Sequence, residues 1–190
     1  MKTHLPKHLS QQRFAPHQIA TILSYFDPIE IEKQGFFLKT GQICRRAAFI
    51  ESGFLMYFKI NDRGEEVVCD FAQEGSWAAQ YESFINQAQS PLSIKAIEPT
   101  RIQAISFDAL NKLYETVPAF EKYTRSIVEK EFFNSIKRTS DFQAMLAEER
   151  YQQILTTKPE LLQRVPQYYL ANYLGVAPQS LSRIRKNFKL

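Results

Sequence analysis

The chain has 190 residues, 44% of them hydrophobic, and a formal net charge of +4. This composition is that of a globular protein and excludes a disordered chain. The sequence contains no apolar run of about 18 residues, which excludes a membrane-spanning helix. Its first residues lack the apolar stretch of a secretory signal, so we expect a cytoplasmic protein whose two cysteines are reduced.

The positive charge is concentrated at the C-terminal end. Residues 158–190 contain six Lys or Arg and one Glu, a net charge of +5, whereas residues 1–115 contain 12 basic and 13 acidic residues, and residues 116–157 contain six of each. A local basic segment of this kind favours a polyanionic partner, of which nucleic acid is the obvious class.

Residues 1–115 predict a small antiparallel β-domain after one short helix at Ala15–Phe26, which Asp27-Pro28 ends. Short runs rich in Phe, Ile, Val and Tyr follow, with glycines between them, and Asn61–Gly64 is typical of a hairpin turn. Many short strands at this spacing predict a β-barrel or jelly roll. The expected strands are Ile29–Glu32, Phe36–Lys39, Ala47–Glu51, Phe54–Ile60, Val67–Phe71, Leu92–Ile97 and Arg101–Ser106.

Residues 116–142 predict one long helix, with Pro118 in its first turn, after a short helix at Phe107–Tyr114. A helix that is apolar on two sides must bury both. The second side could be buried within one chain or against the same helix of a second copy. We favour the second copy, because no later segment is large enough to cover this side. One side holds Phe120, Tyr123 and Ile127, and the other holds Val128, Phe132 and Ile136.

Residues 143–190 predict a helical domain with one helix at Glu148–Thr157 and a helix-turn-helix from Gln167 to Lys186. Ala171 supplies the small residue that two crossing helices need, and Gly175 permits the sharp turn. Apolar positions at Leu170, Leu174, Val176, Leu181 and Ile184 complete the pattern. An ordinary helical hairpin with a solvated basic face is the competing interpretation. Only a short connection, ELLQRVP, precedes the motif, so we expect a short or absent wing.

The outer face of the second helix of this motif is polar. Arginine can pair bidentately with guanine and glutamine with adenine, while serine hydroxyls suit bases or phosphates. We expect Arg185 and Lys189 to contact phosphate. The predicted DNA-binding residues are Gln179, Ser180, Ser182, Arg183, Arg185 and Lys186.

With these features, the chain resembles the Crp–Fnr family of transcription regulators. The stretches that carry the resemblance are QGFFLKTGQICRRAAFIESGFLMYFKINDRGEEVVCDF, EGSWAAQYESF, SPLSIKAIEPTRIQAIS, EERYQQIL and LANYLGVAPQSLSRIRK. The resemblance implies an α+β fold with a cyclic-nucleotide-binding-like sensor domain (1–115), a dimerisation helix (116–142) and a DNA-binding domain (143–190). The implied partners are a second copy, a near-palindromic double-stranded operator, RNA polymerase and a small-molecule effector.

The residues that would bind a cyclic nucleotide depart from the family pattern. Cyclic-AMP binders of the family carry a Gly-Glu pair and an Arg-Ser pair, which by alignment become Ala79-Gln80 and Ser90-Pro91. Arginine offers a charged fork to phosphate, whereas proline has no N–H to donate. A buried phosphate without a cationic partner is costly, so we expect no tight binding of cyclic AMP.

Two interpretations of the barrel interior stay open. It could hold another ligand, for which the polar candidates are Gln80, Tyr81, Glu82, Ser83 and Ser90. Alternatively, it could be filled by its own side chains, such as Trp77, Tyr81 and Phe84.

Nothing in the sequence favours an enzyme, a metal site or a cofactor. All three histidines, His4, His8 and His17, lie in the first 17 residues, where we expect no packed structure. Two cysteines cannot supply the four ligands of an iron–sulfur cluster, although Arg45 and Arg46 beside Cys44 could lower the pKa of its thiol. The alternative function is a small-molecule-binding or protein-interaction module whose basic C-terminus is incidental.

Overall fold

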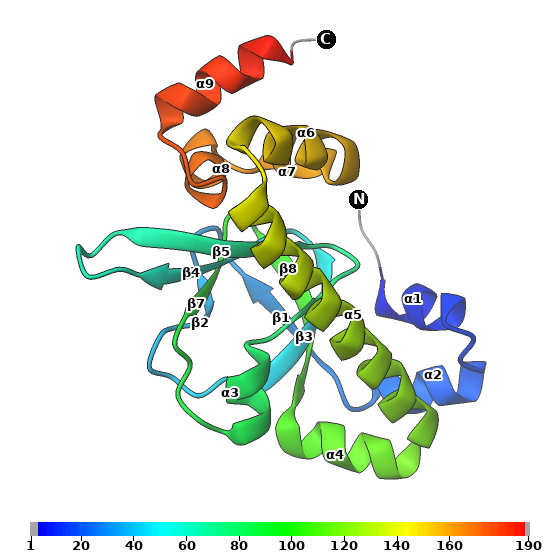
Figure 1. Cartoon of the computed structure of the whole chain (residues 1–190). Coiled ribbons are helices and arrows are strands. Elements are labelled where there is room, and N and C mark those ends of the chain that lie inside the picture. The colour runs from blue at the N-terminus through cyan, green and yellow to red at the C-terminus, as the bar shows by residue number, and fades with distance from the viewer. Residues whose placement is uncertain (1–3, 189–190) are drawn as a thin grey trace. The chain divides into compact units, whose positions relative to one another are not determined.

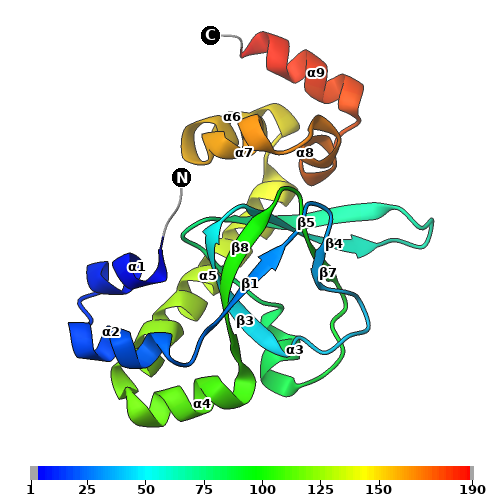
Figure 2. The same ribbon diagram turned by 180° about the vertical axis from the view of Figure 1, so that it is seen from behind.

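The computed structural model describes residues 4–188. The chain divides into two compact units, one ending at Tyr123 and the other starting at Thr124, within the long helix α5 (Pro118–Ala144). Figures 1 and 2 show the elements of the two units from opposite sides. The functional division at residues 115 and 142 stays a prediction.

The first unit contains two four-stranded antiparallel sheets, which confirms the predicted antiparallel β-domain. One sheet has the strand order β1-β8-β3-β6 and the other β2-β7-β4-β5. The sequence predicted seven of these strands but not β6, nor the helix α3 (Tyr81–Asn86) that follows it, because both are too short to show a period. The strands are β1 (Asp27–Ile31), β2 (Phe36–Leu38), β3 (Arg46–Ser52), β4 (Phe54–Ile60), β5 (Glu66–Gln73), β6 (Trp77–Ala78), β7 (Ser93–Ala96) and β8 (Thr100–Ser106).

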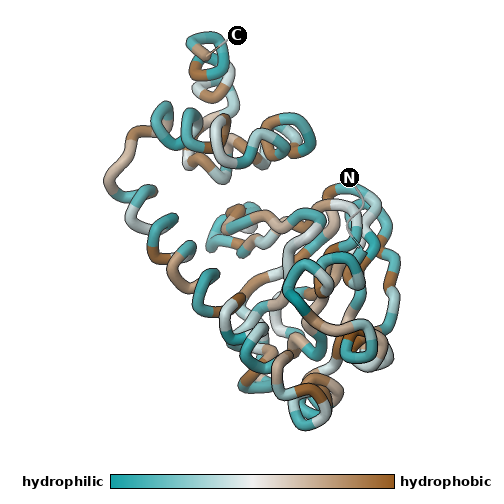
Figure 3. The backbone as a smooth tube through the Cα atoms, turned by 90° about the vertical axis from the view of Figure 1, so that its right-hand side faces the viewer, coloured by the Kyte–Doolittle hydropathy of each residue, from teal (hydrophilic) through white to brown (hydrophobic). Residues whose placement is uncertain are grey.

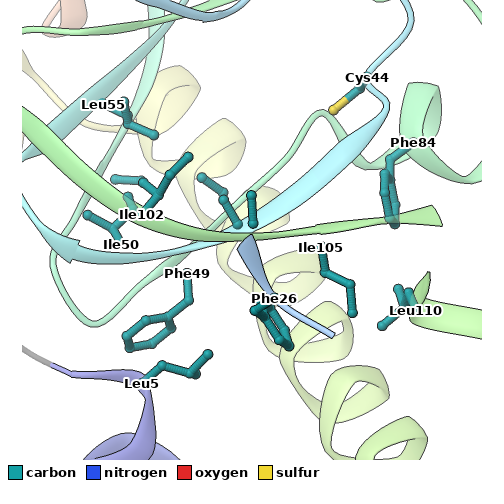
Figure 4. Packing of buried hydrophobic residues seen from close by; sticks show 14 of the residues in the cluster. Leu5, Phe26, Cys44, Phe49, Ile50, Leu55, Phe84, Ile102, Ile105 and Leu110 are labelled. Carbon is teal, nitrogen blue, oxygen red and sulfur yellow. The ribbon is translucent and has the colours of Figure 1, made fainter. Parts of the chain in front are cut away.

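The apolar core of this unit has two layers, because successive side chains of a strand point to opposite faces. Ile50 of β3 and Ile102 of β8 gather near Leu55 of β4, whereas Phe49 lies near Leu5 of the N-terminal helix (Figure 4). All five side chains are at most 1% exposed. One layer therefore fills the space between the sheets, and the other lies between one sheet and the helices.

Two N-terminal helices, α1 (Leu5–Gln11) and α2 (Pro16–Leu23), contribute to the second layer. The expectation that the first residues lie outside the packed structure is therefore wrong. Leu5 and Leu9 are fully buried, and the ring centroid of His8 lies 4.9 Å from that of Phe49. A seven-residue helix is too short to be distinguished from a polar tail by its sequence pattern.

The long helix α5 begins at Pro118, as predicted, after α4 (Phe107–Thr116). Phe120 is fully buried in the core of the first unit. Farther along, α5 carries hydrophobic residues between hydrophilic ones (Figure 3). Three of them, Phe132, Phe133 and Ile136, are each more than half exposed. Of the side of α5 that was predicted to need a partner, Phe132 and Ile136 are thus exposed in residues 4–188, whereas Val128 is half-buried.

Between α5 and residue 188 the chain forms four shorter helices: α6 (Ala147–Thr157), α7 (Pro159–Arg164), α8 (Gln167–Tyr173) and α9 (Pro178–Asn187). The segment expected as a plain connection before the motif is α7, which Pro159 begins. From residue 124 to residue 188 the structure has no strand, in agreement with a short or absent wing. In the described part of the chain, no helix combines the length and the apolar character that crossing a membrane requires.

Candidate nucleic-acid interface

The helices α8 and α9 pack through the residues that the sequence pattern assigns to their inner faces, except Val176, which lies half-buried in the turn before α9. Leu170, Ala171, Leu174, Leu181 and Ile184 are each at most 5% exposed. Ala171 is fully buried, so a larger side chain at this point would force the helices apart. This packing determines which side of α9 faces away from the core.

The turn between the two helices is closed by a Schellman motif. The N–H of Val176 donates to the carbonyl of Ala171 and the N–H of Gly175 to that of Asn172, both at 3.0 Å. Gly175 has a φ of +69°, a left-handed conformation that costs other residues about 1–2 kcal/mol. A Cβ at this position would also lie 2.9 Å from Cζ of Phe142. Glycine is thus needed both for the backbone conformation and for space.

A residue that the sequence analysis did not identify, Arg150 of α6, holds this turn in place. Its Nη2 donates to the carbonyl of Leu174 at 2.7 Å, and its Nη1 donates to the carbonyls of Phe142 and Met145. Its guanidinium carbon lies 4.6 Å from the ring centroid of Phe142. Arg150 therefore connects the C-terminal ends of α5 and α8, and no local sequence motif indicates such a contact.

The exposed side of α9 carries most of the predicted DNA-binding residues. At about 100° per residue, Gln179, Ser182, Arg183 and Lys186 lie opposite the buried Leu181 and Ile184, and all four are exposed. Ser180 and Arg185 lie on the flanks of this face. The helix contains no acidic residue.

Two further details concern this face. The Oγ of Ser182 accepts a hydrogen bond from Nε2 of Gln167 at 2.7 Å, so α8 orients that hydroxyl. Lys189, expected to contact phosphate, lies outside the described residues.

The five polar residues predicted for a barrel ligand do not form one open site. Tyr81 and Glu82 are exposed on α3. Ser83 is buried, and its Oγ accepts from the Cys44 N–H at 2.9 Å and donates to the Ala88 carbonyl. The side chain of Gln80 caps α3 by accepting from the Ser83 N–H. Ser90 is also buried, and its Oγ donates to the Leu92 carbonyl at 2.7 Å.

The three side chains named as alternative filling of the barrel have different surroundings. Phe84 is buried, with its ring 5.6 Å from that of Phe107. Trp77 packs among aromatic residues of the helix-covered layer, including Phe49 and Phe120, whereas Tyr81 is 52% exposed. Tyr81 therefore does not fill the barrel.

The cysteines show no sign of activation. Burial raises the pKa of the Cys44 thiol, whose Sγ donates to the Arg46 carbonyl at 3.3 Å. The expectation that Arg45 and Arg46 lower this pKa is therefore wrong. Within residues 4–188, no group of three or more His, Cys, Asp or Glu side chains is placed to hold a metal ion.

The sequence of this chain is similar to those of known proteins. Residues 28–117 match the family model of the cyclic nucleotide-binding domain. The transcriptional activator protein Anr of Pseudomonas aeruginosa is 26% identical over 178 residues, covering 84% of this chain and 72% of the relative. This relative is a transcription activator and not an enzyme, which agrees with the interpretation of the sequence.

Solved structures with the same fold include two bacterial proteins. The c-di-GMP-responsive global regulator CLP of Xanthomonas campestris has a TM-score of 0.72 at 17% identity, with 91% of each chain covered. FixK2 of Bradyrhizobium japonicum has a TM-score of 0.72 at 14% identity, covering 85% of this chain and 83% of its own. At this level of identity, the similarity establishes the fold.

Proposed function

We propose that the chain, whose residues 28–117 match the cyclic nucleotide-binding domain, is a transcription regulator of the Crp–Fnr family. It acts in the cytoplasm as a homodimer that reads a near-palindromic DNA operator through α9. The observation that carries this proposal is the outer face of α9, where four exposed polar or basic side chains lie opposite the buried side of the helix. A helix with this pattern suits the major groove, where its N-terminal residues reach base edges. Contact with RNA polymerase belongs to the same proposal.

Dimerisation through α5 is supported by its uncovered apolar side. Phe132, Phe133 and Ile136 are 61%, 67% and 53% exposed, and large apolar side chains gathered on one surface mark interaction sites. A second copy of the same helix would cover them symmetrically. The two recognition helices of such a dimer would meet half-sites about 10–10.5 base pairs apart.

We further propose that cyclic AMP is not the effector. Ser90 and Pro91 stand where cyclic-AMP binders of the family have Arg and Ser, so no guanidinium is offered to a phosphate there. The Ser90 hydroxyl is already engaged with Leu92. A micromolar dissociation constant for cyclic AMP in calorimetry would contradict this part of the proposal.

Selection of bound genomic fragments tests the proposal most directly. We expect one near-palindromic sequence to be enriched, with an affinity that falls steeply as salt rises, because phosphate contacts release counterions. If no fragment were enriched, with or without a metabolite extract, the alternative of a small-molecule-binding or protein-interaction module would be favoured.

Arg183 is the side chain for which we expect the largest single effect on sequence recognition. Arg183→Ala should weaken binding to the selected operator by about 1–3 kcal/mol and relax the preference at one base pair. Fluorescence anisotropy on the operator and on its single-base variants measures both quantities.

Arg185 on the flank of α9 provides the matched control. Arg185→Ala should weaken binding to all sequences alike and reduce the salt slope by about 1, as expected for a phosphate contact. If Arg183→Ala retained the base preferences of the unmodified protein, the role assigned to Arg183 would be wrong.

A further inference from the structure

An open pocket lies in the first unit, between the edge strands of its two sheets. β1 is the outer strand of one sheet and β2 the outer strand of the other. A pocket of about 540 Å³ is lined by residues of both strands and by residues 42–46. We call it the edge pocket. Sites for small molecules typically have volumes of about 300–1,000 Å³, so its size suits such a ligand.

The edge pocket carries uncompensated positive charge. Arg45 lines it, is exposed, and makes no hydrogen bond or ion pair with any other residue in 4–188. Arg46 has one ion pair there, at 3.8 Å to Asp27, with 45% and 72% of the two side chains exposed. An exposed pair of this kind is weak. None of the described residues that line the pocket is acidic.

The remainder of the lining is largely apolar. Ile31 and Leu38 are at most 8% exposed and belong to the core of the sandwich, against which Ile29 packs. Phe36 is 44% exposed, with Nζ of Lys39 4.9 Å from its ring centroid. A ligand that fits this lining needs both an apolar body and an anionic group.

We infer that the edge pocket binds a small amphipathic carboxylate, such as a medium-chain fatty acid, with its chain against Ile29 and Ile31 and its carboxylate at Arg45. The planar guanidinium matches a carboxylate with two parallel hydrogen bonds. Burial of the chain on the isoleucines adds a hydrophobic contribution. The inference deepens the proposed function. Binding of the ligand does not depend on that function, whereas the role of the ligand as an effector rests on it.

The wall of the edge pocket is connected to the segment that holds a cyclic nucleotide in other members of the family. The Cys44 N–H donates to Ser83 of α3, and the Ser90 N–H donates to the Gln42 carbonyl at 2.8 Å. A ligand that displaces residues 42–44 would thus also shift α3 and the segment before β7.

Titration of the full chain with decanoate, without DNA and below its micelle-forming concentration, tests the inference. Calorimetry should show saturable binding that Arg45→Gln weakens about tenfold or more, because a charge-assisted hydrogen bond is lost. Decanol should bind the unmodified protein more weakly by a similar factor. Arg63→Gln, at the exposed β4–β5 turn, is the matched control and should leave the affinity unchanged.

Methyl NMR locates the ligand in the same titration. The methyl resonances of Ile29 and Ile31 should shift, whereas that of Ile136 on α5 should not. Equal affinity of Arg45→Gln and the unmodified protein, shifts at Ile136 in place of Ile29 and Ile31, or no binding to the folded protein would each overturn the inference. If decanoate bound to the protein but no DNA fragment were enriched in the selection, the proposed function would be contradicted, whereas ligand binding in the edge pocket would be supported.

Discussion

At the scale of single residues, the hydroxyl of Tyr123 joins three elements of the first unit. Nε1 of Trp77 in β6 donates to it at 2.9 Å, and Nε2 of His8 in α1 lies 2.7 Å from it. An indole N–H can only donate, so the Tyr123 oxygen accepts from Trp77, and we expect the Tyr123 hydrogen to be donated to Nε2 of a neutral His8. Burial raises the pKa of Tyr123 to about 12, which keeps this hydrogen in place. The arrangement needs a neutral His8 with its own proton on Nδ1.

This arrangement predicts a pH dependence of folding. Burial lowers the pKa of His8, so the unfolded chain binds a proton there more readily than the folded protein does. The contribution of His8 to stability is therefore complete above the ordinary pKa of about 6.5 and is lost as the pH falls through the folded-state value. We expect the urea midpoint, followed by Trp77 fluorescence, to fall between about pH 7 and pH 5, and His8→Gln to reduce this fall.

Other polar side chains near α1 require matched variants. Nδ1 of His4 lies 3.6 Å from Oε1 of Glu51, which also accepts from the Leu5 N–H at 3.3 Å. The two proteins that are compared, with His8 and with His8→Gln, should therefore both carry His4→Gln. His17, which is exposed, serves as the control, since His17→Gln should leave the slope unchanged. If His8→Gln did not alter the change of the urea midpoint with pH, the proposed coupling of His8 to Tyr123 would be excluded.

Residues on the outside of α9 could be predicted from the sequence, while two structural residues could not. Gln179, Ser182, Arg183 and Lys186 follow from the helical period once Leu181 and Ile184 define the inner face. His8 meets Tyr123 across 115 positions of sequence, and Arg150 meets Leu174 across 24. Neither contact has a local pattern that would indicate it.

At the scale of elements, the α8–α9 turn has a definite energetic requirement at Gly175. Gly175→Ala should reduce the free energy of unfolding of the second unit by about 1–2 kcal/mol for the left-handed backbone. The close approach to Phe142 adds to this cost. Urea unfolding followed by circular dichroism measures the loss, and operator affinity should fall with it because α9 is displaced.

Two variants separate the causes of this loss. Gly41 also has a positive φ, of +82°, but a Cβ there would meet nothing within 4 Å, so Gly41→Ala should show the backbone cost alone. Combining Gly175→Ala with Phe142→Leu should restore part of the loss. A Gly175→Ala protein as stable as the unmodified one would mean that the turn does not adopt this conformation.

Longer elements were easier to predict than short ones for a physical reason. Seven strands and α5 contain enough residues to display a period of two or of 3.6. The helices α1, α3 and α7 have six or seven residues each, fewer than two turns, and their stability comes from tertiary packing such as that of Leu5 and Leu161, both at most 2% exposed. The surroundings of the barrel candidates could not be predicted for a related reason, since Ser83 and Ser90 bond to nearby backbone in ways that residue type does not reveal.

At the scale of the whole molecule, α5 contributes to both units and carries two unlike apolar sides. Its first turns are held by Phe120 and Tyr123 in the core of the first unit. The rings of Phe132 and Phe133 lie 5.8 Å apart on the later turns, where both are exposed. A second copy that covers these residues would account for their exposure in a single chain. Each side chain buried in this way contributes about 1.5–3 kcal/mol to the free energy of dimerisation.

Breaking this contact should separate dimerisation from DNA reading. Phe132→Glu would place like charges face to face in an apolar contact, so we expect the dimer dissociation constant to rise more than 100-fold in sedimentation equilibrium, with the fold unchanged by circular dichroism. Binding to the full operator should weaken strongly, whereas the weaker binding to a single half-site, which involves one α9, should persist.

Lys130→Glu, an exposed position well round the helix from Phe132, tests whether added negative charge alone has this effect, and it should leave the dimer intact. A Phe132→Glu protein that remained dimeric would show that the copies meet through another surface, and loss of half-site binding as well would show that the substitution had damaged the second unit.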